Sequence, residues 1–172
     1  MLRTNLWASA LLYSEASFNF YLLTFYLKYF PGNLFENSAY FACSDLLAYV
    51  LTGIFLNFTS MRTSIRFGAA LALTGGFLFL FLSKNINLIP LMLCLCRIGQ
   101  SMIFNTTIIS VNRLFPTLYV ATAYGVVNFC SHLCACLAPF VAEIKYPFPF
   151  IVFVCLIGIA IFTSFFLTEV SE

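Results

Sequence analysis

Residues 97–140 read RIGQSMIFNTTIISVNRLFPTLYVATAYGVVNFCSHLCACLAPF. Two long apolar stretches meet here at a short turn that contains the helix breaker Pro116. At 1.5 Å per residue, each stretch is long enough to cross a membrane as a helix. Each also holds an ionisable side chain away from its ends: Arg97 in the first, which begins near residue 88, and His132 in the second. A charge inside a membrane helix costs roughly 2.5 to 3.5 kcal/mol on insertion scales, so these residues indicate a functional site.

The composition of the whole chain is also that of a membrane protein. The chain has 172 residues, of which 62% are apolar and 8% charged, whereas soluble domains carry about 25% charged residues. No stretch of soluble-domain length separates the apolar segments, which predicts one membrane domain over residues 1–172. The net charge of +2 is scattered singly along the chain, which excludes nucleic-acid binding. Glu15 interrupts the first apolar run, so the start is interpreted as an uncleaved helix and not a signal peptide.

Six segments are apolar over about 20 residues and are separated by Pro, Gly, Asn or charged residues. They predict an all-α six-helix bundle of a multi-pass integral membrane protein, with short connections at the two membrane surfaces. The predicted helices cover about 5–30, 36–58, 65–84, 88–112, 118–142 and 147–168. No repeat of 20 to 50 residues is visible, although the first three and last three helices can still be related in structure alone.

The distribution of positive charge predicts the orientation of the bundle. Six helices place both termini on one side, together with the loops near residues 60 and 115. Cytoplasmic loops are richer in Lys and Arg, and the terminal side has four such residues against three, so we expect cytoplasmic termini. The terminal side holds Arg3, Arg62, Arg66 and Arg113, and the other side holds Lys28, Lys84 and Lys145.

Four ionisable residues lie about 13 to 21 Å from the ends of their predicted helices. They are Glu15, Asp45, Arg97 and His132. Because all four approach the midplane, the sequence predicts that they form one solute-binding site. The alternative is structural, since Asp45 or Glu15 can neutralise Arg97 in a buried ion pair that fixes helix register.

His132 has three neighbouring cysteines, at positions 130, 134 and 136. A helix turns by 100° per residue, which puts Cys130 with Cys134 on one face and His132 with Cys136 on another. We therefore expect no metal site and no other cofactor. His132 either faces a pathway, where its titration near neutral pH suits proton coupling, or packs between helices.

Glycines at 68, 75, 76, 99 and 125 are expected to allow close approach of helices. The chain shows no histidine cluster, no nucleophile spaced from a base and no phosphate-binding loop. The sequence therefore favours a protein that is not an enzyme.

Three blocks of sequence resemble the C-terminal half of the major facilitator superfamily, and within it the organic cation and anion transporters. Asp45-Leu-Leu-Ala-Tyr49 is similar to the Glu-Ile-Pro-Ala-Tyr of the family's eighth helix. Arg97-Ile-Gly99 resembles a basic-x-Gly motif in the tenth helix, and Leu114-Phe-Pro-Thr117 resembles the turn that follows it. The stretch from Thr122 to Phe140 matches the eleventh helix.

The resemblance implies helices seven to twelve of a twelve-helix transporter. It places His132 where anion transporters tend to carry Arg and cation transporters Asp, a position associated with charge selectivity. It also implies gating roles for Arg62, Arg113 and Pro116. The family's acid after the eighth helix is absent here, its acid before the Leu-Phe-Pro-Thr turn is Arg113, and its following Arg is Val120. The charge latch of the family is therefore largely lost.

Two functions follow as expectations. The first is transport of a small organic solute or ion by one half of an alternating-access carrier. That half needs a second six-helix bundle, which is another chain, a second copy of this one, or a missing half encoded upstream in a longer form of this chain. The second is a structural subunit of a larger membrane complex, derived from a transporter half and no longer moving a solute.

Overall fold

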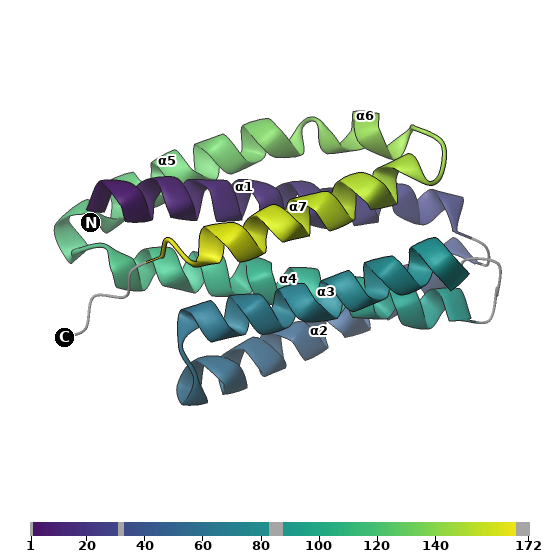
Figure 1. Cartoon of the computed structure of the whole chain (residues 1–172), viewed down its shortest axis with the longest axis horizontal. Helices are drawn as coiled ribbons and strands as arrows, with labels where there is room; N and C mark the ends of the chain where they lie inside the picture. The colour runs from purple at the N-terminus through teal and green to yellow at the C-terminus, as the bar shows by residue number, and fades with distance from the viewer. Residues whose placement is uncertain (1, 31–32, 83–87, 168–172) are drawn as a thin grey trace.

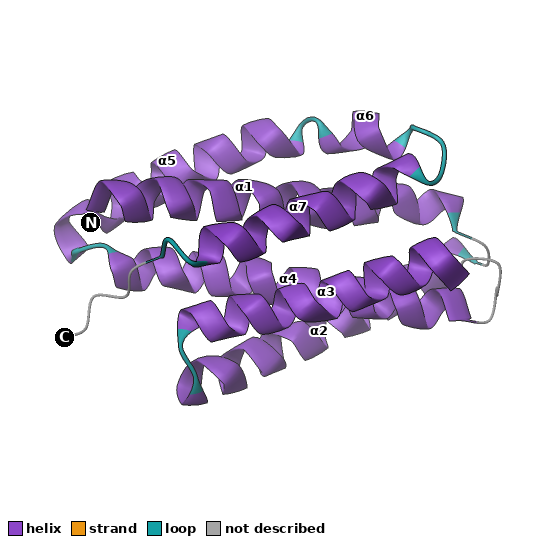
Figure 2. Ribbon diagram, viewed as in Figure 1, coloured by secondary structure: helices purple, strands orange, loops and turns teal. Residues whose placement is uncertain are grey.

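The computed structural model describes residues 2–30, 33–82 and 88–167. Within these ranges the chain is helical and contains no strand, which confirms the all-α prediction. Figures 1 and 2 show long helices lying side by side and alternating in direction, with the start of α1 and the end of α7 at the same end of the bundle. The helices are α1 (Leu2–Tyr26), η1 (Leu27–Tyr29), α2 (Leu34–Phe58), α3 (Met61–Leu82), α4 (Ile89–Leu114), α5 (Thr117–Ala135), α6 (Ala138–Ala142) and α7 (Phe148–Ser164).

Several predicted boundaries are wrong. The first helix ends at Tyr26 and continues as one turn of 3-10 helix, and α3 begins at Met61 instead of residue 65. The fifth predicted helix is interrupted between α5 and α6, where Pro139 has no N–H to donate to the carbonyl group of Ala135. The last helix ends at Ser164, four residues before the predicted end. Residues 83 and 84, the end of the third predicted helix, lie outside the described residues.

Four helices in the described ranges are long and apolar enough to cross a membrane: α2, α3, α4 and the combined segment Thr117–Ala142. Four of the six predicted spans are thus long and apolar enough to cross a membrane. Helix α7 is shorter, with 17 residues. Helix α1 is 25 residues long but bears many polar side chains, and these are buried in the bundle: Asn5, Ser9, Glu15, Ser17 and Asn19.

The surface of the bundle is apolar, the reverse of what a water-soluble helical protein shows. Large apolar side chains with about two thirds or more of their area exposed occur on most of the helices. Lipid tails tolerate such a surface, and the polar side chains of α1 face the interior of the bundle instead. The most exposed of these side chains are Phe35, Phe58, Leu118, Phe81, Phe140, Trp7, Leu46 and Phe129.

Helix packing relates the first three long helices to the last three. Helices α1 and α4 lie at the centre and pack against each other; α1 also packs against α5 and α7, and α4 against α2 and α3. Helix α3 in turn contacts α7. Exchanging α1 with α4, α2 with α5 and α3 with α7 reproduces this set of contacts. Helices α1 and α4 run in opposite directions (Figure 1), as the equivalent helices of an inverted repeat do.

The most extensive contact is between α3 and α4, and it depends on glycine. A Cβ atom on Gly99 would lie 2.4 Å from the carbonyl oxygen of Gly68 and 2.4 Å from the backbone nitrogen of Ala72. Gly75 approaches the backbone of Cys96 in the same way. The prediction of close approach is therefore confirmed at these positions. It is wrong for Gly125, which has nothing within 4 Å of its Cβ position.

An exposed ion pair joins η1 to the end of α6, at the end of the bundle away from the start of α1. Lys28 of η1 donates to Glu143, which also accepts a hydrogen bond from the hydroxyl group of Tyr29. The hydrogen bond to Glu143 raises the pKa of Lys28 above its usual value, and the hydrogen bond from Lys28 lowers the pKa of Glu143. Both side chains lie beyond the ends of the spanning helices.

We expect Glu143→Gln to lower the melting temperature (Tm) slightly at neutral pH. Because folding lowers the pKa of Glu143, the ionised carboxylate stabilises the folded protein at pH values above the usual glutamate pKa of about 4.3. This stabilisation disappears as the pH falls through the pKa that Glu143 has in the folded protein. The raised pKa of Lys28 means that the contribution of Lys28 disappears only as the pH rises through a value above about 10.4. The Tm difference between the two proteins should therefore vanish in acid and shrink in high salt. An unchanged difference at pH 3 would show that the ion pair does not cause it.

Candidate functional site

The predicted partners Arg97 and Asp45 meet between α4 and α2. Nε of Arg97 donates to Oδ1 of Asp45 and Nη2 donates to Oδ2, both at 2.8 Å. This is a bidentate pair, the geometry in which a guanidinium group binds a carboxylate most specifically. The hydroxyl group of Ser101, one helical turn after Arg97, donates to Oδ1 of the same carboxylate at 2.5 Å.

Helix α1 completes the environment of the guanidinium group. Nη1 of Arg97 donates to the carbonyl oxygen of Phe20 at 3.0 Å and to the hydroxyl group of Thr24 at 2.9 Å. The guanidinium carbon also lies 3.6 Å from the centre of the Phe20 ring and 5.0 Å from that of Phe41, as in cation–π contacts. Arg97 thus joins three helices, α1, α2 and α4.

Exposure differs between the two partners. The side chain of Arg97 is 5% exposed, whereas that of Asp45 is 24% exposed. Thr24, on the other side of the guanidinium group, is also exposed. The pair therefore lies at the margin of the interior, with part of the Asp45 carboxylate exposed.

Glu15 does not join this pair. Its Oε1 accepts a hydrogen bond of 2.7 Å from Nδ2 of Asn19, and the side chain is buried between α1, α4 and α7. His132 is exposed in the last turn of α5. Among the described residues, no ion pair or hydrogen bond links Glu15 or His132 to Arg97 or Asp45. The prediction of one site with four ionisable groups is thus reduced to two groups in contact.

The predicted gating residues lie at the end of the bundle that holds the start of α1. Arg62 is in the first turn of α3, and its Nε is buried without a hydrogen-bond partner among the described residues. Arg113 is exposed in the last turn of α4. Pro116 precedes α5, and its carbonyl group accepts from the N–H groups of Tyr119 and Val120 at 2.9 and 3.0 Å. In the described ranges neither arginine forms an ion pair, which agrees with the loss of latch acids seen in the sequence.

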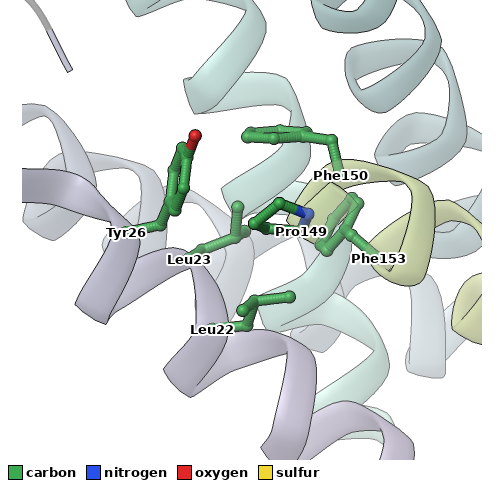
Figure 3. Close-up of a pocket in the computed structure, with 6 residues that line it drawn as sticks. All are labelled: Leu22, Leu23, Tyr26, Pro149, Phe150 and Phe153. Carbon is green, nitrogen blue, oxygen red and sulfur yellow. The ribbon is translucent and has the colours of Figure 1, made fainter. Parts of the chain in front are cut away.

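Two hollows flank α1. Figure 3 shows the first, between α1 and α7, where the ring of Tyr26 lies edge-on to that of Phe150 with 5.6 Å between centroids. This hollow is lined by apolar side chains and has no room for a water molecule, so it is packing. The second is a groove of about 400 Å³ between the first turns of α1 and α5, lined by apolar residues together with Arg3, Tyr119 and Thr122. Its volume lies in the range typical of sites for small molecules.

Several polar side chains that bond to the charged residues were not predicted from the sequence. Ser101 follows Arg97 by four residues, and Asn19 follows Glu15 by four. Such spacings place side chains on the same helix face, so periodicity alone indicates these partners. Phe20 and Thr24 come from a helix that is distant in sequence, and no local pattern points to them.

Comparison with models of known protein families gives no match to this chain, and comparison with curated proteins gives none either. The fold and the site thus define the class of the molecule at the level of a helical bundle with four potential membrane spans and a partly buried ion pair between α2 and α4, which α1 also contacts.

Proposed function

We propose that this chain is one half of a multi-pass, alternating-access transporter for a small organic solute or ion. Carriers of this kind often consist of inverted repeats, with substrate contacts near the membrane midplane. The main contacts of α1, α2 and α3 correspond to those of α4, α5 and α7, which supports the first of these features, an inverted repeat. The position of Asp45 and Arg97 well inside their helices supports the second.

The observation on which the proposal depends is the Arg97–Asp45 pair. A pair of opposite charges that is partly exposed can open to admit an anion at the guanidinium group or a cation at the carboxylate. A completely enclosed pair would offer neither partner to a solute. The resemblance to the organic cation and anion transporters is consistent with a solute of either charge.

A second six-helix bundle is required, since one bundle cannot alternate its access alone. We propose that this bundle packs against α2 and α5, the two spanning helices with the smallest buried share. Each of them packs mainly against one central helix and leaves the rest of its surface free for a partner or lipid. The partner is a different chain, a second copy of this chain, or part of a longer form of it.

Substitution of His132 tests the charge selectivity that the resemblance implies. In vesicles that contain the native complex, we expect His132→Asp to favour uptake of organic cations and His132→Arg to favour organic anions. A charge at position 132 near the solute path changes the interaction energy of a cationic or an anionic solute by about 1 kcal/mol in a water-like environment. This corresponds to roughly a fivefold change in the rate of uptake. The measurement is the ratio of cation to anion uptake across a panel of labelled solutes.

His132→Gln is the matched control for this experiment, because it changes the shape of the side chain without adding charge. Its uptake ratio should stay close to that of the natural protein. Equal ratios for the Asp, Arg and Gln variants would place His132 away from the solute path.

One observation favours a structural subunit as a second candidate. Four hydrogen bonds and two aromatic rings already stabilise the guanidinium group of Arg97 without any ligand. A pair of this kind can fix the register of α1, α2 and α4 in a complex that moves no solute. In that case detergent extraction should recover this chain only in a large assembly, and recovery with a single partner bundle would count against it.

A further inference from the structure

Glu15 is the most deeply buried acid in the described part of the chain and has no place in the Arg97 site. It is 5% exposed, and its neighbours Asn19 and Gln100 are fully buried. Asn19 bridges α1 to α7 by donating to Glu15 and to the carbonyl oxygen of Phe153 at 3.3 Å. Gln100 of α4 donates to the carbonyl oxygen of Ala16 at 3.1 Å. These three side chains, here named the Glu15 cluster, join α1, α4 and α7.

No cationic side chain in the described ranges meets the Glu15 cluster. From α4 the nearest cation is Arg97, which is bound in its own ion pair. Helix α5 contributes Tyr124 and the exposed His132, and the ionisable side chain of α7 is the exposed Cys155. An ionised carboxylate isolated inside a protein is very costly, so Glu15 either takes up a proton or is compensated by a cation from outside the chain.

The cluster also holds three hydrogen-bond acceptors without a partner among the described residues. They are Oε2 of Glu15, Oδ1 of Asn19 and Oε1 of Gln100. The orientation of both amides is fixed, because each amide nitrogen already donates to an oxygen that can only accept. The three atoms without a partner are therefore all oxygens, and each of them needs a cation or a hydrogen-bond donor.

A proton on Glu15 does not satisfy this group. It would donate one hydrogen bond to one amide oxygen and leave the other without a partner. A metal cation accepts electron pairs from several oxygens at once, and carboxylate and amide oxygens are the ligands preferred by hard cations. One carboxylate balances a single positive charge, while a divalent ion would leave a net charge in the apolar interior.

We propose that the Glu15 cluster binds one monovalent metal cation of the size of Na⁺ between α1, α4 and α7. Asn19 of α1 and Gln100 of α4 supply neutral oxygen ligands, and Asn19 also bonds to α7 through the carbonyl group of Phe153. Helix α1 also provides Phe20 and Thr24 to Arg97, so the ion and the ion pair share one helix. The role of the cation as a coupling ion rests on the proposed transport function, whereas its binding does not.

The test is the Tm of the purified full chain, together with any partner that co-purifies. The titration compares NaCl with N-methyl-D-glucamine chloride at constant ionic strength. The expected result is a saturable rise in Tm with Na⁺ for the natural protein, because a ligand that binds only the folded state stabilises it. Glu15→Gln should remove this response. Without Na⁺, the same variant should melt at a temperature equal to or above that of the natural protein, because it no longer buries a carboxylate.

Two further variants keep the test decisive. Glu36→Gln makes the same change at an exposed acid in the first turn of α2 and should keep the full Na⁺ response. Gln100→Leu keeps the carboxylate but removes one oxygen, so it should need a several-fold higher Na⁺ concentration for the same rise.

An equal Tm of the natural protein in both salts would overturn the ion site, as would a full response in Glu15→Gln. A Tm that follows pH but not Na⁺ would show that a proton occupies the cluster instead, and would also overturn it. None of these measurements uses solute uptake. A failed uptake assay therefore leaves the ion site intact, and a missing Na⁺ response leaves the transport proposal intact.

Discussion

Arg97→Ala is expected to abolish solute uptake and to destabilise the folded bundle by about 3 to 5 kcal/mol, the usual cost of leaving one member of a buried ion pair alone. The substitution leaves the carboxylate of Asp45 facing Ser101 only, and it removes the link from α4 to α1. The protein should still reach the membrane, because Ala makes α4 more apolar. Uptake by the native complex in vesicles and unfolding in detergent measure the two effects.

A double variant separates the structural role of the pair from its role in transport. Arg97→Met with Asp45→Leu replaces both charges by apolar side chains of similar size, which is often neutral or stabilising. We expect it to regain most of the stability lost in Arg97→Ala and still to transport nothing. Unchanged uptake in the double variant would refute the assignment of Arg97 and Asp45 to solute binding. It would then favour the structural subunit.

Gly99→Leu is expected to prevent stable packing of α3 against α4. A Cβ atom at this position would overlap the backbone of α3 at 2.4 Å, and backbone cannot move aside as a flexible side chain can. Gly99→Ala alone should cost about 1 to 3 kcal/mol, in the range of overpacking, and the larger side chain should leave little folded protein. The measurement is unfolding in detergent for Ala, and the yield of monodisperse protein for Leu.

Gly125→Ala is the matched control, since its Cβ position has nothing within 4 Å. The same change in the middle of a helix should be neutral or slightly stabilising there, because Ala is the better helix former. A loss of stability at Gly125 equal to that at Gly99 would mean that helix propensity or lipid contact, and not the α3–α4 approach, determines the effect.

The all-helical architecture could be predicted because apolar stretches of about 20 residues and proline-containing turns are local signals. The central position of α1 could not. Its polar residues lower its mean hydropathy, and only packing shows that Asn5, Ser9 and Asn19 point inward. The break after Ala135 was also missed, although Pro139 is a local signal for it.

The candidate site was predictable in part for a physical reason. A charged side chain inside a membrane needs an opposite charge, so the sequence leaves two candidates for the partner of Arg97, namely Asp45 and Glu15. The sequence does not decide between these acids, because the decision depends on which helix lies beside α4. Helix α2 brings Asp45 to the guanidinium group, while the side chain of Glu15 bonds to Asn19, which itself reaches α7. Depth in the membrane is thus insufficient to predict that groups share a site.

The size and composition of the native complex test the central claim most directly. The chain would be extracted in a mild detergent, and the intact complex measured by native mass spectrometry. A half transporter predicts this chain together with one further six-helix bundle, found as a second chain, a second copy or a longer form of the same chain. An assembly of many different subunits, with no species that contains only two bundles, would contradict the transport proposal and favour the structural subunit.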